Sequence, residues 1–152
     1  MKKLRLLLIL SLTSLFLACS EDDGGGDTID PDGSINQDLI VGSWRVTKEV
    51  DVYDGITETY PAECPTEVVL DITDTMFTTK NDEDCDGNFD YEDTFSYSIQ
   101  AYGGFENVLF INNAPGAIVV SLSNTTLILR EDYITDPDSN EEEYYDVYFT
   151  KI

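Results

Sequence analysis

Acidic side chains recur at alternate positions in the stretch DEDCDGNFDYED, residues 82–93. Carboxylates stand at its first, third and fifth places, a glycine at the sixth and an aspartate at the ninth, which is the spacing of a calcium-binding loop. The carboxylates that would hold the ion are Asp82, Asp84, Asp86, Asp90 and Asp93. The last replaces the usual glutamate, and strands rather than helices are predicted on both sides. Because such spacing arises easily by chance in an acidic chain, the sequence favours a solvated loop over a specific calcium site.

Enzymatic chemistry has little support in this sequence. The chain contains no histidine, so Ser-His and Cys-His catalysis are excluded together with the commonest ligand of transition metals. The carboxylates are scattered, and no two of them stand apart as a general acid and base. We therefore expect no catalytic residues and no enzymatic activity.

Cys19 stands where the most apolar and the most acidic parts of the chain meet. Residues 1–18 form a basic start followed by an apolar run, which is typical of a secretory signal peptide and shorter than the roughly 20 residues of a transmembrane helix. The stretch LFLAC, 15–19, resembles the bacterial lipobox, with Phe16 where leucine is usual. This resemblance implies a lipoprotein signal peptide over 1–18 and a covalent diacylglycerol and acyl lipid on Cys19.

An acidic cluster directly follows the predicted lipid. Ser20, Glu21, Asp22 and Asp23 resemble the sorting signal of Bacteroidota surface lipoproteins, although a plain solvated linker would share their composition. Residues 19–37 contain few apolar side chains and are predicted to form a flexible tether. The resemblance implies an outer-membrane lipoprotein exposed on the cell surface, and the leaflet it finally occupies stays open.

The charge balance limits the partners of the chain. It carries 31 acidic and 8 basic residues, a net charge of −23. Three of the basic residues and none of the acids lie in 1–18, so the remainder carries 5 basic and 31 acidic residues, a net charge of −26. Nucleic-acid binding needs Lys and Arg to displace counterions and is not expected. Anionic membrane surfaces are also repelled, so attachment to the membrane would depend on the lipid.

Cys64 and Cys85 remain after the lipidated cysteine is set aside. Export places them in an oxidising compartment, where an even pair usually forms a disulfide. Closing a loop of about 20 residues would contribute about 3 kcal/mol in the chain-entropy model. A metal site built on two thiolates would need further soft ligands that the chain does not supply.

Residues 38–152 alternate apolar and polar side chains with a period of two, which is typical of half-buried antiparallel strands. Pairs such as Asp54-Gly55 and Gly103-Gly104 mark tight turns between them. The strands are predicted near 42–53, 56–60, 67–72, 75–80, 89–99, 107–112, 117–122, 126–133 and 143–152, with one helical turn near 36–40. We therefore predict a single all-β domain, an antiparallel meander that closes into a barrel or a sandwich.

The two ends of this domain carry a family resemblance. The stretch LIVGSW, 39–44, resembles the entry of lipocalin-like domains, and the stretches IVVSLSNTTLILRED and YYDVYFTKI resemble the last strands of small lipocalin-like lipoproteins of Bacteroidota. The family implies an antiparallel up-and-down barrel of about eight strands, with Trp44 plugging one end. It also implies that an arginine of a late strand, here Arg130, stacks on that ring, unless Arg130 is simply exposed. The interior of such barrels can hold a small apolar molecule.

Ten residues are predicted to face a ligand inside the barrel. They are Lys48, Phe89, Tyr91, Asp93, Phe95, Tyr97, Val108, Phe110, Val147 and Phe149. The two charges among them, Lys48 and Asp93, either pair inside the barrel or are turned out to solvent by bulges, and the second arrangement is favoured because an unpaired buried charge is costly.

The leading functional hypothesis is a surface-tethered barrel that binds or buffers a small apolar ligand. The alternative is a structural or adhesive surface protein with a packed barrel, whose acidic loops contact a partner or calcium. A continuous cavity would favour the first hypothesis and a filled interior the second.

Replacement of the predicted lipid acceptor tests the predicted attachment of the protein to the membrane. Cys19→Ala should release the protein from membranes or block its cleavage, because no thiol remains to carry the lipid. Membrane fractionation and intact-mass analysis measure both effects. Unchanged partition together with unchanged mass would rule out lipidation.

Overall fold

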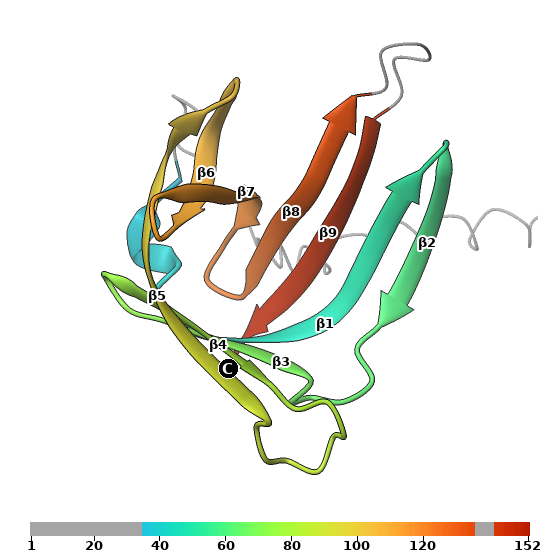
Figure 1. Cartoon of the computed structure of the whole chain (residues 1–152), viewed down its shortest axis with the longest axis vertical. Helices are drawn as coiled ribbons and strands as arrows, with labels where there is room; N and C mark the ends of the chain where they lie inside the picture. Colours follow the sequence, from blue (N-terminus) through green and yellow to red (C-terminus); the bar gives the residue numbers. More distant parts are fainter. Residues whose placement is uncertain (1–34, 136–141) are drawn as a thin grey trace, which may run out of the picture.

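The computed structural model describes residues 35–135 and 142–152, whose strands form one antiparallel sheet (Figure 1). Its elements are η1 (Gln37–Leu39), β1 (Gly42–Tyr53), β2 (Ile56–Pro61), β3 (Val68–Ile72), β4 (Met76–Asn81), β5 (Tyr91–Tyr102), β6 (Phe105–Ile111), β7 (Ala114–Leu122), β8 (Thr126–Thr135) and β9 (Glu142–Lys151). The predicted all-β class is confirmed, with nine strands rather than about eight. In these residues no helix is long and apolar enough to cross a bilayer.

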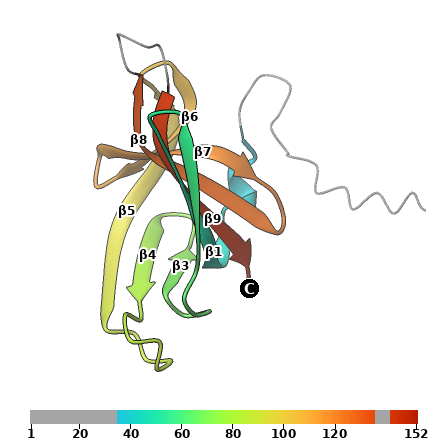
Figure 2. The same ribbon diagram turned by 90° about the vertical axis from the view of Figure 1, so that its right-hand side faces the viewer.

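Strand β1 closes the sheet into a ring. The strand order is β2-β1-β3-β4-β5-β6-β7-β8-β9, and β1 also pairs with β9. Residues 42–45 of β1 pair with β3, whereas residues 48–53 pair with β2, so β2 extends the sheet beside the ring. Figures 1 and 2 show β8, β9, β1 and β2 lying together, with β5 to β7 on the other side and β3 and β4 at one end.

Three of the hairpins turn through two residues with positive φ. The φ values are 55° and 72° at Asp54 and Gly55, 62° and 91° at Gly103 and Gly104, and 51° and 66° at Asn112 and Asn113. Positive φ at both central positions matches the right-handed twist of the flanking strands, and Asn, Asp and Gly reach it at the least cost. These residues therefore set the register of three of the hairpins.

Trp44 fills the end of the ring where the chain enters. Its side chain is fully buried, and its indole Nε1 donates to the carbonyl oxygen of Ile40 at 2.8 Å. The cation beside the ring is Lys151, with Nζ 5.0 Å from the ring centroid and 3.1 Å from the carbonyl oxygen of Leu39. The predicted stacking of Arg130 on Trp44 is therefore wrong, because the last strand brings Lys151 to that place.

Gly42 leaves room for this lysine. A Cβ built at Gly42 would lie 2.6 Å from Lys151 Cε, and the φ of Gly42 is +140°. A side chain there would displace Lys151 and strain the backbone. In the Gly-x-Trp sequence, the glycine thus allows the Lys151 side chain to approach the backbone, and the tryptophan fills the end of the ring.

A β-bulge in β1 changes which of its residues point into the ring: even-numbered residues do so before the bulge and odd-numbered residues after it. Val46 lies opposite Phe149, but Lys48 lies opposite Tyr148, so one extra residue enters β1 between them. Beyond the bulge Glu49 lies opposite the core residue Val147 and therefore faces inward. The inner face of β1 is thus apolar near Trp44 and acidic further along.

Truncation of the plug should be among the most damaging single changes to this fold. Trp44→Ala removes a fully buried ring, and we expect a loss of about 3–5 kcal/mol in the free energy of unfolding. Tyr91→Ala is the matched control, because Tyr91 is 56% exposed and should change stability by only about 0.5 kcal/mol. Urea denaturation measures both, and similar losses would contradict the plug.

Candidate functional site

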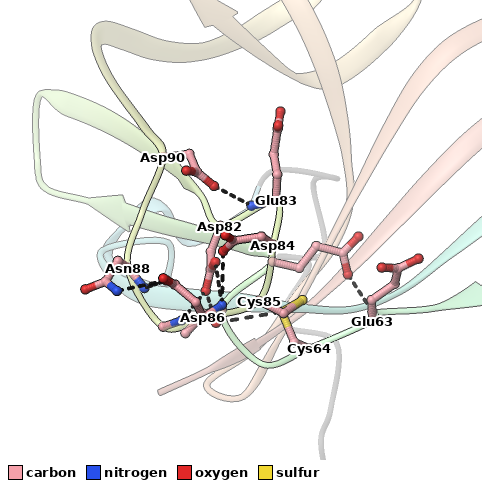
Figure 3. The surroundings of a disulfide bond; sticks show 12 residues. Glu63, Cys64, Asp82, Glu83, Asp84, Cys85, Asp86, Asn88 and Asp90 are labelled. Carbon is pink, nitrogen blue, oxygen red and sulfur yellow. Dashed lines mark hydrogen bonds between the residues drawn. A yellow bond between two sulfur atoms is a disulfide. The ribbon is translucent and has the colours of Figure 1, made fainter.

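The acidic loop between β4 and β5 is organised around one buried carboxylate (Figure 3). Asp82 is fully buried and accepts hydrogen bonds from the Thr66 hydroxyl at 2.5 Å, the Gly87 amide at 2.9 Å and the Asp86 amide at 3.1 Å. The Thr66 hydrogen bond first, and then the two amides, hold the pKa of Asp82 below its usual range against the opposing effect of burial. Asp82 therefore stabilises the loop as an ionised acceptor.

Three of the five predicted calcium ligands lie together in this loop. Asp82, Asp84 and Asp86 each place one carboxylate oxygen within 4.8 Å of the others. Asp90 instead accepts a hydrogen bond from the Glu83 amide at 2.9 Å, and Asp93 lies in β5 opposite Thr79. The described loop therefore brings together three of the five predicted carboxylates, because Asp90 and Asp93 are not part of this group.

The predicted disulfide is confirmed. Cys64 and Cys85 are bonded, with Cα atoms 5.8 Å apart, and the bond joins the acidic loop to the segment that follows β2 (Figure 3). Asp82 and the disulfide thus fix the same loop by a hydrogen-bond network and a covalent bond.

Four of the ten predicted ligand-facing residues belong to the packed side of the ring. Val147 and Phe149 are members of the buried core, and Tyr97 packs against it. Phe95 lies opposite the core residue Phe77 and is half-buried. These side chains fill the ring, together with the other members of a core cluster of fifteen buried residues that includes Trp44.

Four other aromatic and aliphatic predictions are wrong. Val108 and Phe110 are buried outside the core cluster, because the register of β6 places Leu109 on the core side. Phe89 lies in the loop before β5 and is 41% exposed, and Tyr91 at the start of β5 is 56% exposed. The strand predicted near 89–99 thus begins later, at Tyr91, and its first residue is exposed rather than packed in the core.

Lys48 and Asp93 do not pair inside the ring, and for Lys48 the favoured alternative, a bulge that turns the charge outward, is found. The bulge in β1 turns Lys48 to the outer face, where its Nζ lies 4.1 Å from the centroid of the Tyr148 ring. Asp93 lies on the same side of β5 as Phe95, the side that faces inward, but its side chain is exposed.

The outer face of β8 and β9 holds an ion pair that the sequence analysis missed. Arg130 donates through Nε to Asp146 Oδ1 at 2.7 Å and through Nη2 to Oδ2 at 2.9 Å, and its guanidinium lies 3.6 Å from the centroid of the Tyr144 ring. Asp146 raises the pKa of Arg130 further above its usual range. The alternation of Tyr144, Asp146 and Tyr148 along β9 could have indicated a shared face opposite Arg130.

One hollow among the described residues lies beside the acidic half of β1. Its volume is about 510 Å³, and its lining is Val46, Glu49, Tyr60, Pro61, Ala62, Glu63 and Glu67. A second hollow of about 380 Å³ is lined by Asp51, Val52, Tyr53, Glu131, Asp132, Glu143, Tyr144 and Tyr145. None of the ten predicted ligand-facing residues is in either lining; beyond the bulge in β1, the inward position belongs to Glu49 rather than to Lys48.

A hydrogen bond joins Tyr145, in the lining of the second hollow, to Glu49, in the lining of the first. Its hydroxyl donates to Glu49 Oε2, and burial, that hydrogen bond and nearby acids raise its pKa well above the usual range. Burial also raises the pKa of the Glu131 carboxyl, and the charges of Asp132 and Glu49 add to this effect. The inner face at this end of the ring therefore has a surplus of negative charge.

Comparison with known proteins gives a family match and a similar solved structure. A family model described as a lipocalin-like domain matches residues 40–129, more than half of the chain. Among solved structures, the chain is similar to a lipocalin-like protein from Bacteroides uniformis ATCC 8492, with 16% sequence identity, a TM-score of 0.43, and coverage of 76% of this chain and 99% of that chain. Among curated proteins no significant match is found.

Breaking the outer-face ion pair should destabilise the sheet. Arg130→Met leaves the buried carboxylate of Asp146 without its cation, and we expect a loss of about 3–5 kcal/mol in unfolding free energy. Lys80→Met breaks the more exposed pair with Asp71 and should cost about 0–1 kcal/mol. Equal losses in urea denaturation at neutral pH would contradict the assignment.

Asp82 should make the stability of the loop depend on pH. Its folded pKa lies below the unfolded value of about 3.9, so its contribution is present above that value and is lost as the pH falls through the folded pKa. Thr66→Val removes the strongest cause of the shift, so the variant should be less stable at neutral pH and the difference should shrink at about pH 3. Thr57→Val on the exposed strand β2 is the control. A difference independent of pH would refute this role.

Proposed function

Because the chain belongs to the lipocalin-like domain family, we propose that it is a lipid-anchored protein of the outer membrane, exposed on the cell surface, whose barrel binds or buffers a small apolar ligand. The anchor is proposed from the sequence of residues 1–37, since Cys19, the acidic sorting cluster Ser20–Asp23 and nearly all of the tether lie outside the described residues. No catalytic role is proposed.

The observation that carries ligand binding is the hollow of about 510 Å³ beside β1 and β2. Small-molecule sites typically have volumes of about 300–1,000 Å³ and combine apolar walls with a few polar groups. Val46, Pro61 and Ala62 supply apolar surface in this hollow, and Tyr60 supplies an aromatic ring. The Trp44 end of the ring is filled by the core, so the ligand is proposed to bind at the acidic end.

One observation favours the second candidate, a structural or adhesive surface protein. Fifteen buried side chains pack the ring, as expected for a small barrel that fills itself. The loop that carries Asp82, Asp84 and Asp86 is held rigidly by the disulfide and by hydrogen bonds, which suits a contact with a partner or with calcium.

A neutral apolar fluorophore separates the two candidates. N-phenyl-1-naphthylamine should bind one-to-one to the purified residues 19–152, because Pro61, Ala62 and the Tyr60 ring offer it apolar surface in the hollow. Ala62→Trp should fill the hollow and weaken binding at least about tenfold, equivalent to about 1.4 kcal/mol. Asn124→Trp, in the exposed β7–β8 turn, should leave binding unchanged. Absence of binding to the unaltered protein would favour the structural candidate.

A further inference from the structure

The lining of the large hollow has one sign of charge. Glu49, Glu63 and Glu67 line it, and no lysine or arginine does. The Glu67 carboxylate accepts a hydrogen bond from the Glu63 amide at 2.6 Å, and Glu49 accepts one from the Tyr145 hydroxyl. These donors are uncharged, so the negative charge of the lining is not neutralised by them.

The basic residues of the described chain lie elsewhere. Lys80 and Arg130 form ion pairs with Asp71 and Asp146, at 2.6 Å and 2.7 Å. Lys48 lies over the Tyr148 ring, and Lys151 lies between Trp44 and the Leu39 carbonyl.

Arg45, the fifth, is exposed and lies opposite Thr150 and Val69, away from the buried side chains of Trp44 and Val46. A hollow lined by one sign of charge concentrates counterions of the other sign, so this hollow should attract cations.

The shape and the apolar walls of the hollow fit an organic cation better than a metal ion. Val46, only 2% exposed, Pro61 and Ala62 offer no ligand atoms from their side chains. Calcium takes 6–8 oxygen ligands at about 2.3–2.6 Å, and apolar side chains supply none of them. Tyr60 adds an aromatic face, which attracts an ammonium group through its ring quadrupole.

The neighbouring hollow has the same chemistry. Asp51, Glu131, Asp132 and Glu143 line it together with three tyrosines. The raised pKa of Glu131 reflects the cost of holding a carboxylate near other acids in a partly buried place. A bound cation would relieve this cost at the neighbouring hollow.

We propose that the hollow beside β1 and β2 binds an organic cation, an amine or quaternary ammonium compound with a short apolar body. This inference rests on the proposed ligand-binding function of the same site and names its ligand class. The ammonium group contacts Glu49 and Glu67, and the apolar body lies against Val46 and Ala62.

Three probes of equal chain length isolate the charge preference. n-Hexylammonium, 1-hexanol and hexanoate are titrated calorimetrically into the purified residues 19–152 at low ionic strength. Hexylammonium should bind about tenfold tighter than hexanol, and hexanoate weakest, because two or three partly exposed carboxylates each contribute about 0.2–1 kcal/mol. The preference should shrink as salt screens the charges.

Matched variants separate the site from the general negative charge of the chain. Glu49→Gln with Glu67→Gln keeps the shape and the hydrogen-bond acceptors of the hollow but removes two charges, and it should reduce the preference to about twofold. Asp74→Asn with Glu106→Gln removes two exposed charges outside both hollows and should leave the preference unchanged.

Four outcomes would overturn the inference. Equal binding of hexanol and hexylammonium would remove the charge preference and leave the proposed apolar site intact. Binding of none of the probes up to their solubility would overturn both the inference and the proposed function. A preference that persists in the Glu49/Glu67 variant, or that falls equally in the control, would place the cation elsewhere on the surface. If the Glu49/Glu67 variant is unfolded, a preference of the unaltered protein that salt does not reduce would overturn it.

Discussion

The pairing of β1 with β9 is the interaction on which the rest of the structure depends. It gives β1 a partner on each side along most of its length, so the sheet closes into a ring and the open edges are confined to short stretches. The pairing contains one extra residue in β1, between Val46 and Lys48. Since successive side chains of a strand point to opposite faces, this residue decides which side chains enter the ring and which leave it.

The bulge divides the ring into a packed end and an acidic end. On one side of it Trp44 and Val46 are buried, with Lys151 held against the indole. On the other side Glu49 faces inward, a position that an ionised carboxylate can occupy only where water or a partner reaches it. The hollows therefore lie where the inner face carries acids, and the core fills the ring where that face is apolar.

The sequence predicts the strands well because alternation and turn residues are local properties. Asp54-Gly55, Gly103-Gly104 and Asn112-Asn113 mark three hairpins that the structure contains. Orientation is harder to predict where both faces of a strand are apolar: in β6 Val108, Leu109 and Phe110 are consecutive and all buried, so alternation cannot tell which side meets the core. The same limit applies to the cation beside Trp44, because Arg130 and Lys151 both lie in late strands. Only the register of β9 against β1 places Lys151 opposite Trp44, and only that of β8 against β9 places Arg130 opposite Asp146.

That register is specified twice, by charge and by hydrophobic pattern. Arg130 lies opposite Asp146, and on the other face Leu129 lies opposite Val147. A slip of one residue would separate the ion pair and move the apolar side chains out of the core at the same time. Asp146 in turn lies opposite Val50 of β1, beyond the bulge. Asp146 thus pairs with Arg130 of β8, and the next residue of β9, Val147, lies opposite the inward-facing Glu49 of β1, so the outer-face ion pair and the lining of the hollow meet at neighbouring positions of one strand.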